Sequence, residues 1–192
     1  GGTVGPTTAA NSLSSAGSFD FVGDGGVIAL SNGNYVVLSP SWDSGGSFNA
    51  DFGAITWGNG ATGTTGIVSS ANSLVGSSPG DALGDYSRVY ALSNGNYVVR
   101  SPQWDSLSPA LVDAGAVTWG NGVTGTHGAV SSANSLVGSS ASDQVGSAAV
   151  VALPNGNYVV GSPLWNSTAS DVGAATLADG TNGSFGAVTA NN

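Results

Sequence analysis

The sequence predicts an all-β protein made of three tandem, four-stranded repeats of about 62 residues each. Two observations carry this prediction. The same short words return at nearly constant spacing, and apolar residues form short clusters between turn residues with no sustained helical period. The words begin at Asn32, Asn94 and Asn155 ("NGN"), at Asn11, Asn72 and Asn134 ("NSL"), and at Trp57 and Trp119 ("WGNG"). Residues 1–192 are expected to form a single repeat domain with almost no helix.

The first two apolar clusters of each copy are predicted to form a β-hairpin. The first cluster covers 27–30, 89–92 and 150–153, and the second covers 35–39, 97–101 and 158–162. Asn-Gly stands between them and favours a tight type I′ turn, because both residues tolerate a positive φ.

A third and a fourth strand complete each predicted sheet. The third is expected at 53–57, 115–119 and 173–177, after a Ser-Pro pair that ends the second strand because proline cannot donate a ladder hydrogen bond. The fourth is expected at the end of 67–78 and 129–140, after a glycine-rich excursion. A degraded fourth-strand segment also stands at 11–17.

The order of these segments predicts the repeat boundaries. Repeat 1 covers 11–71, repeat 2 covers 72–133 and repeat 3 covers 134–192, with 1–10 as a closing segment. The third strand of repeat 3 lacks a following fourth strand, and the leading fourth-strand segment lacks a preceding third strand. This cyclic permutation is expected to join the two end segments in one sheet, within the chain or between neighbouring molecules.

Composition and charge argue against several functions. The formal net charge is −9 with only two basic residues, so nucleic acid and anionic membrane surfaces are poor partners. No apolar run is long enough for membrane insertion. With no Glu, no Cys and one His, the chain is not expected to be an enzyme. Separately, it is expected to be a mature secreted chain or a piece of a longer one.

The motifs resemble a known kind of repeat. "D-x-[VL]-G" before the first strand, "NGNYVV-x-SP-x-W" and "GA-[VI]-T-W" are similar to the blades of integrin-α-type, FG-GAP-like β-propellers, and to tandem repeats of large secreted bacterial adhesins of the filamentous-haemagglutinin kind. The resemblance implies one four-stranded blade per repeat, an extracellular setting and a role in adhesion. It would also imply a calcium loop between the first two strands, but a plain Asn-Gly hairpin stands there, so no cofactor is expected and calcium is only weakly supported.

Three blades are fewer than a propeller needs, which leaves several architectures open. A homodimeric six-bladed ring or a slice of a longer propeller is favoured. A monomeric threefold β-prism or β-trefoil is the alternative.

Two sets of residues are candidates for a ligand site. The candidates lie after the second strand and are Trp42, Asp43, Trp104, Asp105, Trp165 and Asn166, which combine an aromatic face with hydrogen-bond acceptors, as a carbohydrate platform does. The competing interpretation is core packing for the tryptophans and Asx-type turns for the aspartates. Asp51 and Asp113, before the third strand, are weak candidates for a calcium site. His127, the only histidine, is expected to be structural.

The function expected from these features is adhesion or binding without catalysis, outside a bacterial cell or on its surface. A glycan or a neighbouring surface would be recognised on the rim formed by the variable loops. The alternative is a structural spacer or a subunit that self-assembles through open strand edges, as a homo-oligomer or within a longer repeat protein.

Overall fold

The computed structural model describes residues 5–45, 48–85 and 89–192, and this part of the chain is all-β. It contains short strands and no helix, and therefore no helix that could cross a membrane. Three similar sheets follow one another along the chain, which confirms the predicted all-β tandem repeat. Arg88, one of the two basic residues, lies outside the described residues.

Each sheet is an antiparallel meander in the predicted strand order. The first contains β2 (Gly26–Ala29), β3 (Tyr35–Ser39), β4 (Ala54–Gly58) and β6 (Ser73–Val75). The second contains β7 (Val89–Ala91), β8 (Tyr97–Ser101), β11 (Ala116–Gly120) and β13 (Ser135–Val137). The third contains β14 (Ala149–Ala152), β15 (Tyr158–Ser162) and β16 (Ala174–Ala178).

The hairpin prediction is confirmed, but the predicted turn type is wrong. Gly33 N–H donates to Leu30 O, and Leu30 N–H donates to Asn34 O, so the loop spans three residues. Only Gly33 has a positive φ, of 87°, whereas Asn32 does not. This is a type I turn followed by a glycine bulge, because the extra serine before Asn-Gly lengthens the loop beyond a two-residue connection.

Short parallel strands, which the sequence analysis did not find, connect neighbouring sheets. They are β5 (Gly66–Ile67), β12 (Gly128–Ala129) and β17 (Gly186–Ala187). β12 pairs with β6 and β17 with β13, the fourth strands of the first and second sheets, and β5 pairs with the leading strand β1 (Leu13–Ser14). Every copy thus adds one strand to the sheet before it.

A turn closed by an asparagine side chain connects β5 to β6 and β12 to β13. Asn72 accepts a hydrogen bond from Ser69 N–H at 2.9 Å and donates to Ile67 O at 2.9 Å. The same pair of bonds recurs at Asn11, Asn134 and Asn192. The asparagine of "NSL" therefore fixes a turn before the strand, rather than belonging to the strand.

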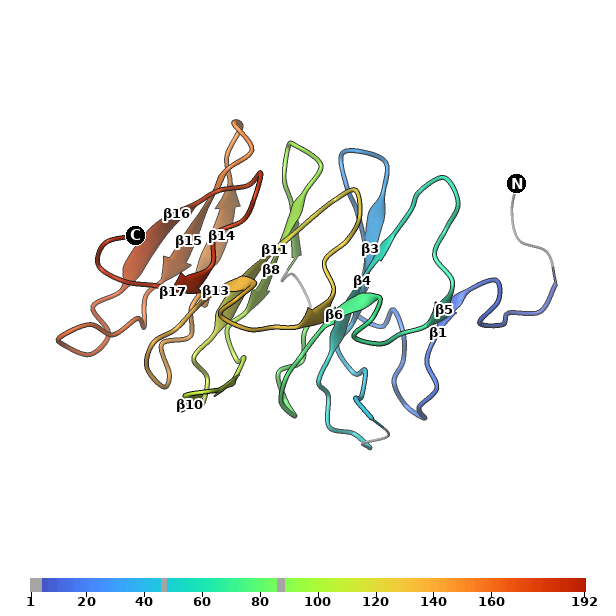
Figure 1. Ribbon diagram of the computed structural model, residues 1–192, viewed down its shortest axis with the longest axis horizontal. Coiled ribbons are helices and arrows are strands. Elements are labelled where there is room, and N and C mark those ends of the chain that lie inside the picture. Colours follow the sequence, from blue (N-terminus) through green and yellow to red (C-terminus); the bar gives the residue numbers. More distant parts are fainter. Residues whose placement is uncertain (1–4, 46–47, 86–88) are drawn as a thin grey trace.

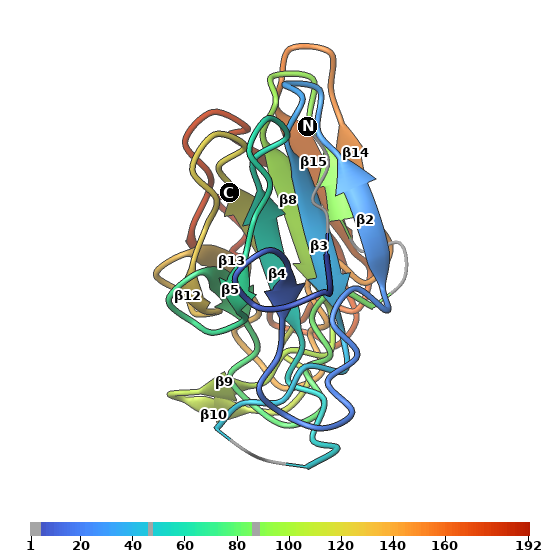
Figure 2. The same cartoon turned by 90° about the vertical axis from the view of Figure 1, so that its right-hand side faces the viewer.

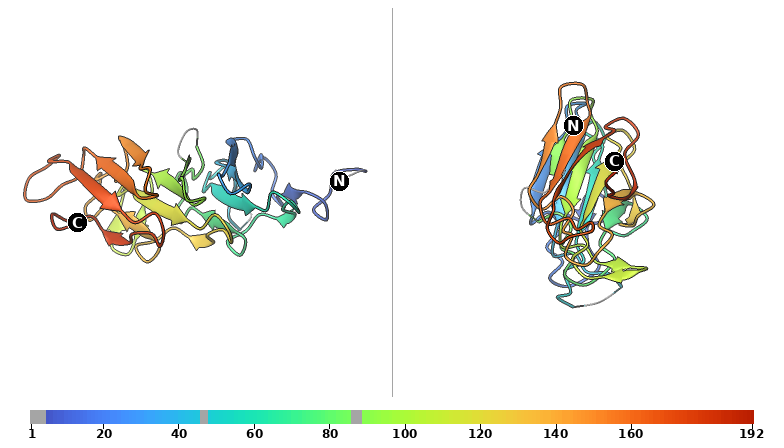
Figure 3. Two further views of the ribbon diagram at one scale, coloured as in Figure 1. Left: turned by 90° about the horizontal axis from the view of Figure 1, so that it is seen from above. Right: turned by 90° about the vertical axis from the view of Figure 1, so that its left-hand side faces the viewer.

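The three sheets stand in a row, with β1 toward one end of the long axis and the third sheet at the other (Figures 1 and 3). Seen along the row, the strands of successive sheets overlie one another (Figure 2). The two end segments do not pair with each other, because β1 pairs with β5 and β17 pairs with β13. The described residues close no ring and surround no threefold axis, so the predicted joining of the ends within one chain is wrong, as are the monomeric prism and trefoil.

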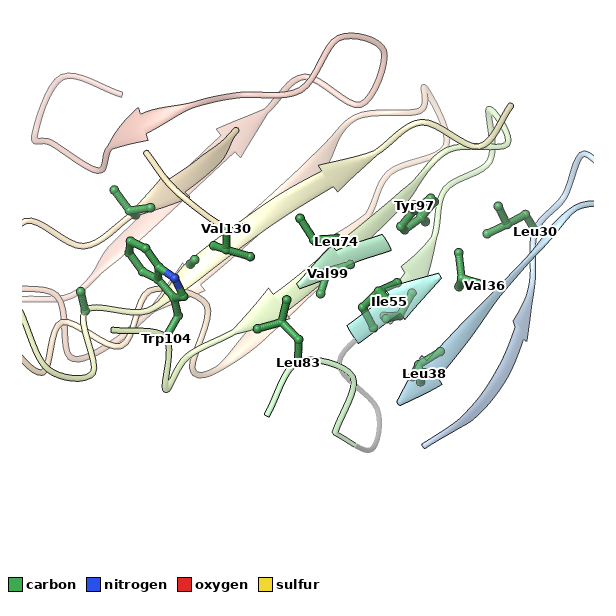
Figure 4. Close-up of a cluster of buried hydrophobic side chains, with 14 residues drawn as sticks. Leu30, Val36, Leu38, Ile55, Leu74, Leu83, Tyr97, Val99, Trp104 and Val130 are labelled. Atoms are coloured by element: carbon green, nitrogen blue, oxygen red, sulfur yellow. The ribbon is translucent and has the colours of Figure 1, made fainter. Parts of the chain in front are cut away.

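The core lies between the sheets. One cluster includes Val36, Ile55 and Leu74 of the first sheet together with Tyr97 and Val99 of the second (Figure 4). A second cluster joins the second and third sheets in the same way. Each sheet therefore buries apolar side chains against its neighbour, as stacked repeats do.

Two short strands in a loop of the second sheet have no counterpart elsewhere in residues 5–45, 48–85 and 89–192. β9 (Ser106–Leu107) and β10 (Ala110–Leu111) form a small antiparallel ribbon in the loop between β8 and β11. The ribbon projects from the edge of the row opposite the three hairpin tips (Figures 1 and 2). The loops after the second strand therefore differ in structure as well as in sequence.

Candidate functional site

The three candidate tryptophans lie inside the molecule. Trp42, Trp104 and Trp165 are all buried: Trp104 and Trp165 pack in the clusters between sheets, and Trp42 packs between the first sheet and the N-terminal segment that includes Leu13. The Trp104 indole N–H donates at 2.7 Å to Ser77 Oγ, which follows β6 of the first sheet. A buried ring offers no free face to a sugar, so the burial supports the packing interpretation, and ligand stacking on these rings stays an untested prediction.

The aspartates after these tryptophans close loops. Asp43 Oδ1 accepts from Ala50 and Asp51 N–H at 2.9 and 2.7 Å, and Asp105 Oδ1 accepts from Asp113 N–H at 2.7 Å. Their counterpart in repeat 3 makes the same bond, from Asp171 N–H to Asn166 Oδ1 at 2.9 Å. These contacts are the Asx-type turns that were the alternative to a ligand site.

The weak calcium candidates contribute backbone N–H groups to these turns. Asp51 and Asp113 donate to the neighbouring carboxylates. Both have a positive φ, of 51° and 50°, where a short polar side chain is tolerated. Among the residues that the structure describes, no group of three or more His, Cys, Asp or Glu side chains could hold a metal ion.

A third set of aspartates joins neighbouring copies. Asp143 is fully buried, and its Oδ2 accepts from Ser139 and Ser140 N–H at 2.8 and 2.9 Å. Its Oδ1 accepts from the N–H and Nδ2 of Asn166, at 3.0 and 2.7 Å, in the loop after β15 of the third sheet. Asp81 links Ser77, Ser78 and Asp105 in the same way. One carboxylate thus ties the end of one sheet to the loop of the next.

Burial raises the pKa values of three side chains, and a hydrogen bond lowers that of a fourth. Burial raises the pKa of Asp81, against the opposing effect of the N–H groups of Asp105, Ser78 and Ser77. Burial also raises the pKa of Tyr97 to about 12 and raises that of Tyr158 further. The N–H of Thr181, which donates to Asp179 Oδ1, lowers the pKa of that carboxyl. The shifts arise from packing and turn closure, and both tyrosines stay neutral near pH 7.

The most regular contact between copies is a single backbone carbonyl that accepts three side-chain donors. Asn32 Nδ2, Asn34 Nδ2 and Trp57 Nε1 of repeat 1 donate to Gly122 O of repeat 2, at 2.7, 2.9 and 2.9 Å. The equivalent donors of repeat 2 bind Gly180 O of repeat 3 at the same three distances; they are Asn94, Asn96 and Trp119. We call this arrangement the carbonyl joint.

The carbonyl joint explains words that the sequence analysis read only as turns and packing. The two asparagines of "NGN" and the tryptophan of "WGNG" are its donors, and the second glycine of "WGNG" is its acceptor. A Cβ at Gly122 would overlap the carbonyl oxygen of Gly95, so only glycine fits. The sequence signal for this contact was the recurrence of both asparagines of "NGN", because a hairpin turn needs only one of them.

Repeat 1 carries an exposed aromatic cluster. Phe19, Phe21 and Phe48 are 58%, 61% and 70% exposed. The ring of Phe19 contacts the other two edge-on, at centroid distances of 6.0 and 5.4 Å. Phe19 and Phe21 hold positive φ angles of 69° and 39°, which a bulky residue adopts at a cost. Exposed apolar groups on strained backbone are typical of a binding surface rather than of packing.

Comparison with known proteins identifies the repeat. A protein family described as "Repeat of unknown function (DUF5650)" matches the chain three times, at residues 29–85, 91–147 and 152–192. No curated protein matches the chain. The three matches follow the three sheets of the structure.

Proposed function

We propose a structural role for this chain, which belongs to the family described as a repeat of unknown function (DUF5650). In this proposal it is a non-enzymatic spacer of a secreted bacterial surface protein. Its repeats stack into an extended rod that carries the variable loops along one edge. The resemblance to the repeats of secreted adhesins supports the extracellular setting.

The observation that carries the proposal is the recurrence of the carbonyl joint. The same three donors meet the same glycine carbonyl at both contacts between copies, with matching distances. The buried carboxylates Asp81 and Asp143 sit at the same two contacts. A contact that repeats along the chain propagates one geometry, which is how solenoid proteins build rods.

A matched pair of substitutions tests the joint. We expect Asn94→Ala to lower the free energy of unfolding by about 1 kcal/mol more than Asn155→Ala. Both lose the turn bond to the N–H two residues ahead, but only Asn94 also loses the bond to Gly180 O. Denaturant unfolding measures the difference. Equal losses would show that the bond to Gly180 does not couple the copies.

The competing arrangement is the six-bladed propeller formed by two chains. Solution scattering separates the two, because the rod predicts an elongated particle whereas the ring predicts a compact dimer. A compact particle with twice the mass of one chain would contradict the rod.

Adhesion through the loop edge is the second candidate function, favoured by the Phe19, Phe21 and Phe48 cluster. Aromatic rings stack on the apolar faces of sugars and bury well against partners, so a glycan array is the first probe. Phe19→Asn with Phe48→Asn is expected to weaken binding at least about tenfold with little change in stability, since asparagine tolerates a positive φ.

Val151→Asn is the control for this variant. Val151 is also exposed, but it lies on β14, away from the cluster. Adhesion at the loop edge is contradicted if the unmodified chain binds no glycan, or if the control weakens binding equally.

A further inference from the structure

The strand β16 has one open edge. The third strands of the first two sheets pair on both sides, β4 with β3 and β6, and β11 with β8 and β13. Within the described part of the chain, β16 pairs with β15 alone. It lies in the sheet nearest the C-terminal end of the row (Figure 1). Its outer backbone N–H and C=O groups can therefore accept another strand.

A buried hydroxyl group on β16 lacks the partner that its counterparts have. Thr56 Oγ1 and Thr118 Oγ1 each lie 2.7 Å from a serine Oγ of the fourth strand, Ser73 and Ser135. Thr176 is only 2% exposed, and its hydroxyl has no hydrogen-bond partner among the described residues. A buried, unpaired hydroxyl is costly, and this one sits at the position where a serine of an added strand would bind.

The apolar surface beside it is also uncovered. Ile55 and Val117 are fully buried in the first two sheets, but Ala175 at the same position of β16 is exposed. The next residue, Leu177, is 64% exposed, whereas its counterparts Trp57 and Trp119 are half-buried. In the other two sheets this face packs against the following sheet, and Leu74 or Leu136 of the fourth strand is buried beside it.

We infer that the open edge of β16 binds one antiparallel strand of sequence Ser-Leu-Val-Gly, the sequence that β6 and β13 form with the glycine after each of them. In the register of the other two sheets, the serine pairs with Thr176, the leucine with Ala175 and the valine with Ala174. The inference rests on the proposed stacking function and names the partner of its terminal sheet: an extended strand with a serine hydroxyl at one fixed position.

The test uses the whole chain and an acetylated peptide of residues 70–78, "SANSLVGSS". Titration followed by NMR is expected to shift the amide signals of 174–178. Thr176→Val in the chain, or Ser73→Ala in the peptide, is expected to weaken binding about fivefold. The two changes together should cost little more than one, because they remove the two ends of one bond.

Thr176→Val is expected to fold, because it removes an unpaired hydroxyl and keeps the shape of the side chain. Equal binding of a scrambled peptide would overturn the inference, as would shifts confined to the outer edges of β2, β7 or β14. Failure of the peptide to bind leaves the internal joint at Asn94 untouched. Equal losses from the two asparagine variants would leave the strand site untouched, so the two proposals fail separately.

Discussion

Asp143→Ala is expected to lower the free energy of unfolding by about 3–5 kcal/mol. The substitution removes the acceptor for three backbone N–H groups, those of Ser139, Ser140 and Asn166, and for the Asn166 side chain. Asp143 is fully buried, so water cannot replace the lost bonds without opening the contact between the second and third sheets. Denaturant unfolding monitored by tryptophan fluorescence measures the loss.

Asp171→Asn is the matched control, because it removes one negative charge from an exposed loop residue of repeat 3. We expect it to change stability by less than about 0.5 kcal/mol. Asp143→Asn should still destabilise, since an amide has only one oxygen where the carboxylate uses two. If Asp143→Ala were as stable as the control, the carboxylate would not hold the two copies together.

Trp104→Ala is expected to cost about 3–5 kcal/mol, because it empties a large buried volume between the first two sheets. It also leaves Ser77 Oγ without its indole donor. Thermal unfolding and hydrogen exchange at β6 and β8 measure the effect. A role in ligand stacking predicts the opposite, a stable protein that has lost only binding.

Two further variants are controls for the loss of packing in Trp104→Ala. Trp104→Phe keeps most of the ring and is expected to cost less than half as much as alanine. Leu107→Ala changes an exposed residue of the same loop and should leave stability nearly unchanged. A near-neutral Trp104→Ala would show that the cavity collapses or that the indole packs weakly.

The sequence was sufficient for the elements that local chemistry determines. Alternating apolar residues and the "NGN" word placed β2, β3 and their copies within about one residue. The missing fourth strand beside β16 also followed from the order of the segments. These features depend on turn residues and on a period of two, both of which can be read within one copy.

Contacts between copies could not be predicted in the same way. β5, β12 and β17 are two-residue strands with no apolar pattern, and they exist only because a neighbouring fourth strand accepts them. Whether the sheets stack in a row or close into a ring could not be predicted from the sequence either. The same hairpins can build a ring or a row, and the difference lies in small rotations between sheets rather than in any residue type.

At the candidate site, too, residue types could be read from the sequence but their contacts could not. The composition of Trp42 and Asp43 suits a sugar platform and a buried loop equally, and only the burial of the indole separates the two. Asp143 and Gly122 bind across copies that are distant in sequence, so their partners became visible only in three dimensions.

The acceptor of the carbonyl joint is a backbone atom, Gly122 O or Gly180 O, and its donors belong to the most uniform words of the repeat. A duplicated gene segment of one period would therefore encode a unit that already fits both of its new neighbours. Gain or loss of whole units by recombination would change the length of the stack without any compensating mutation. The loops on the opposite edge would remain free to diverge in sequence.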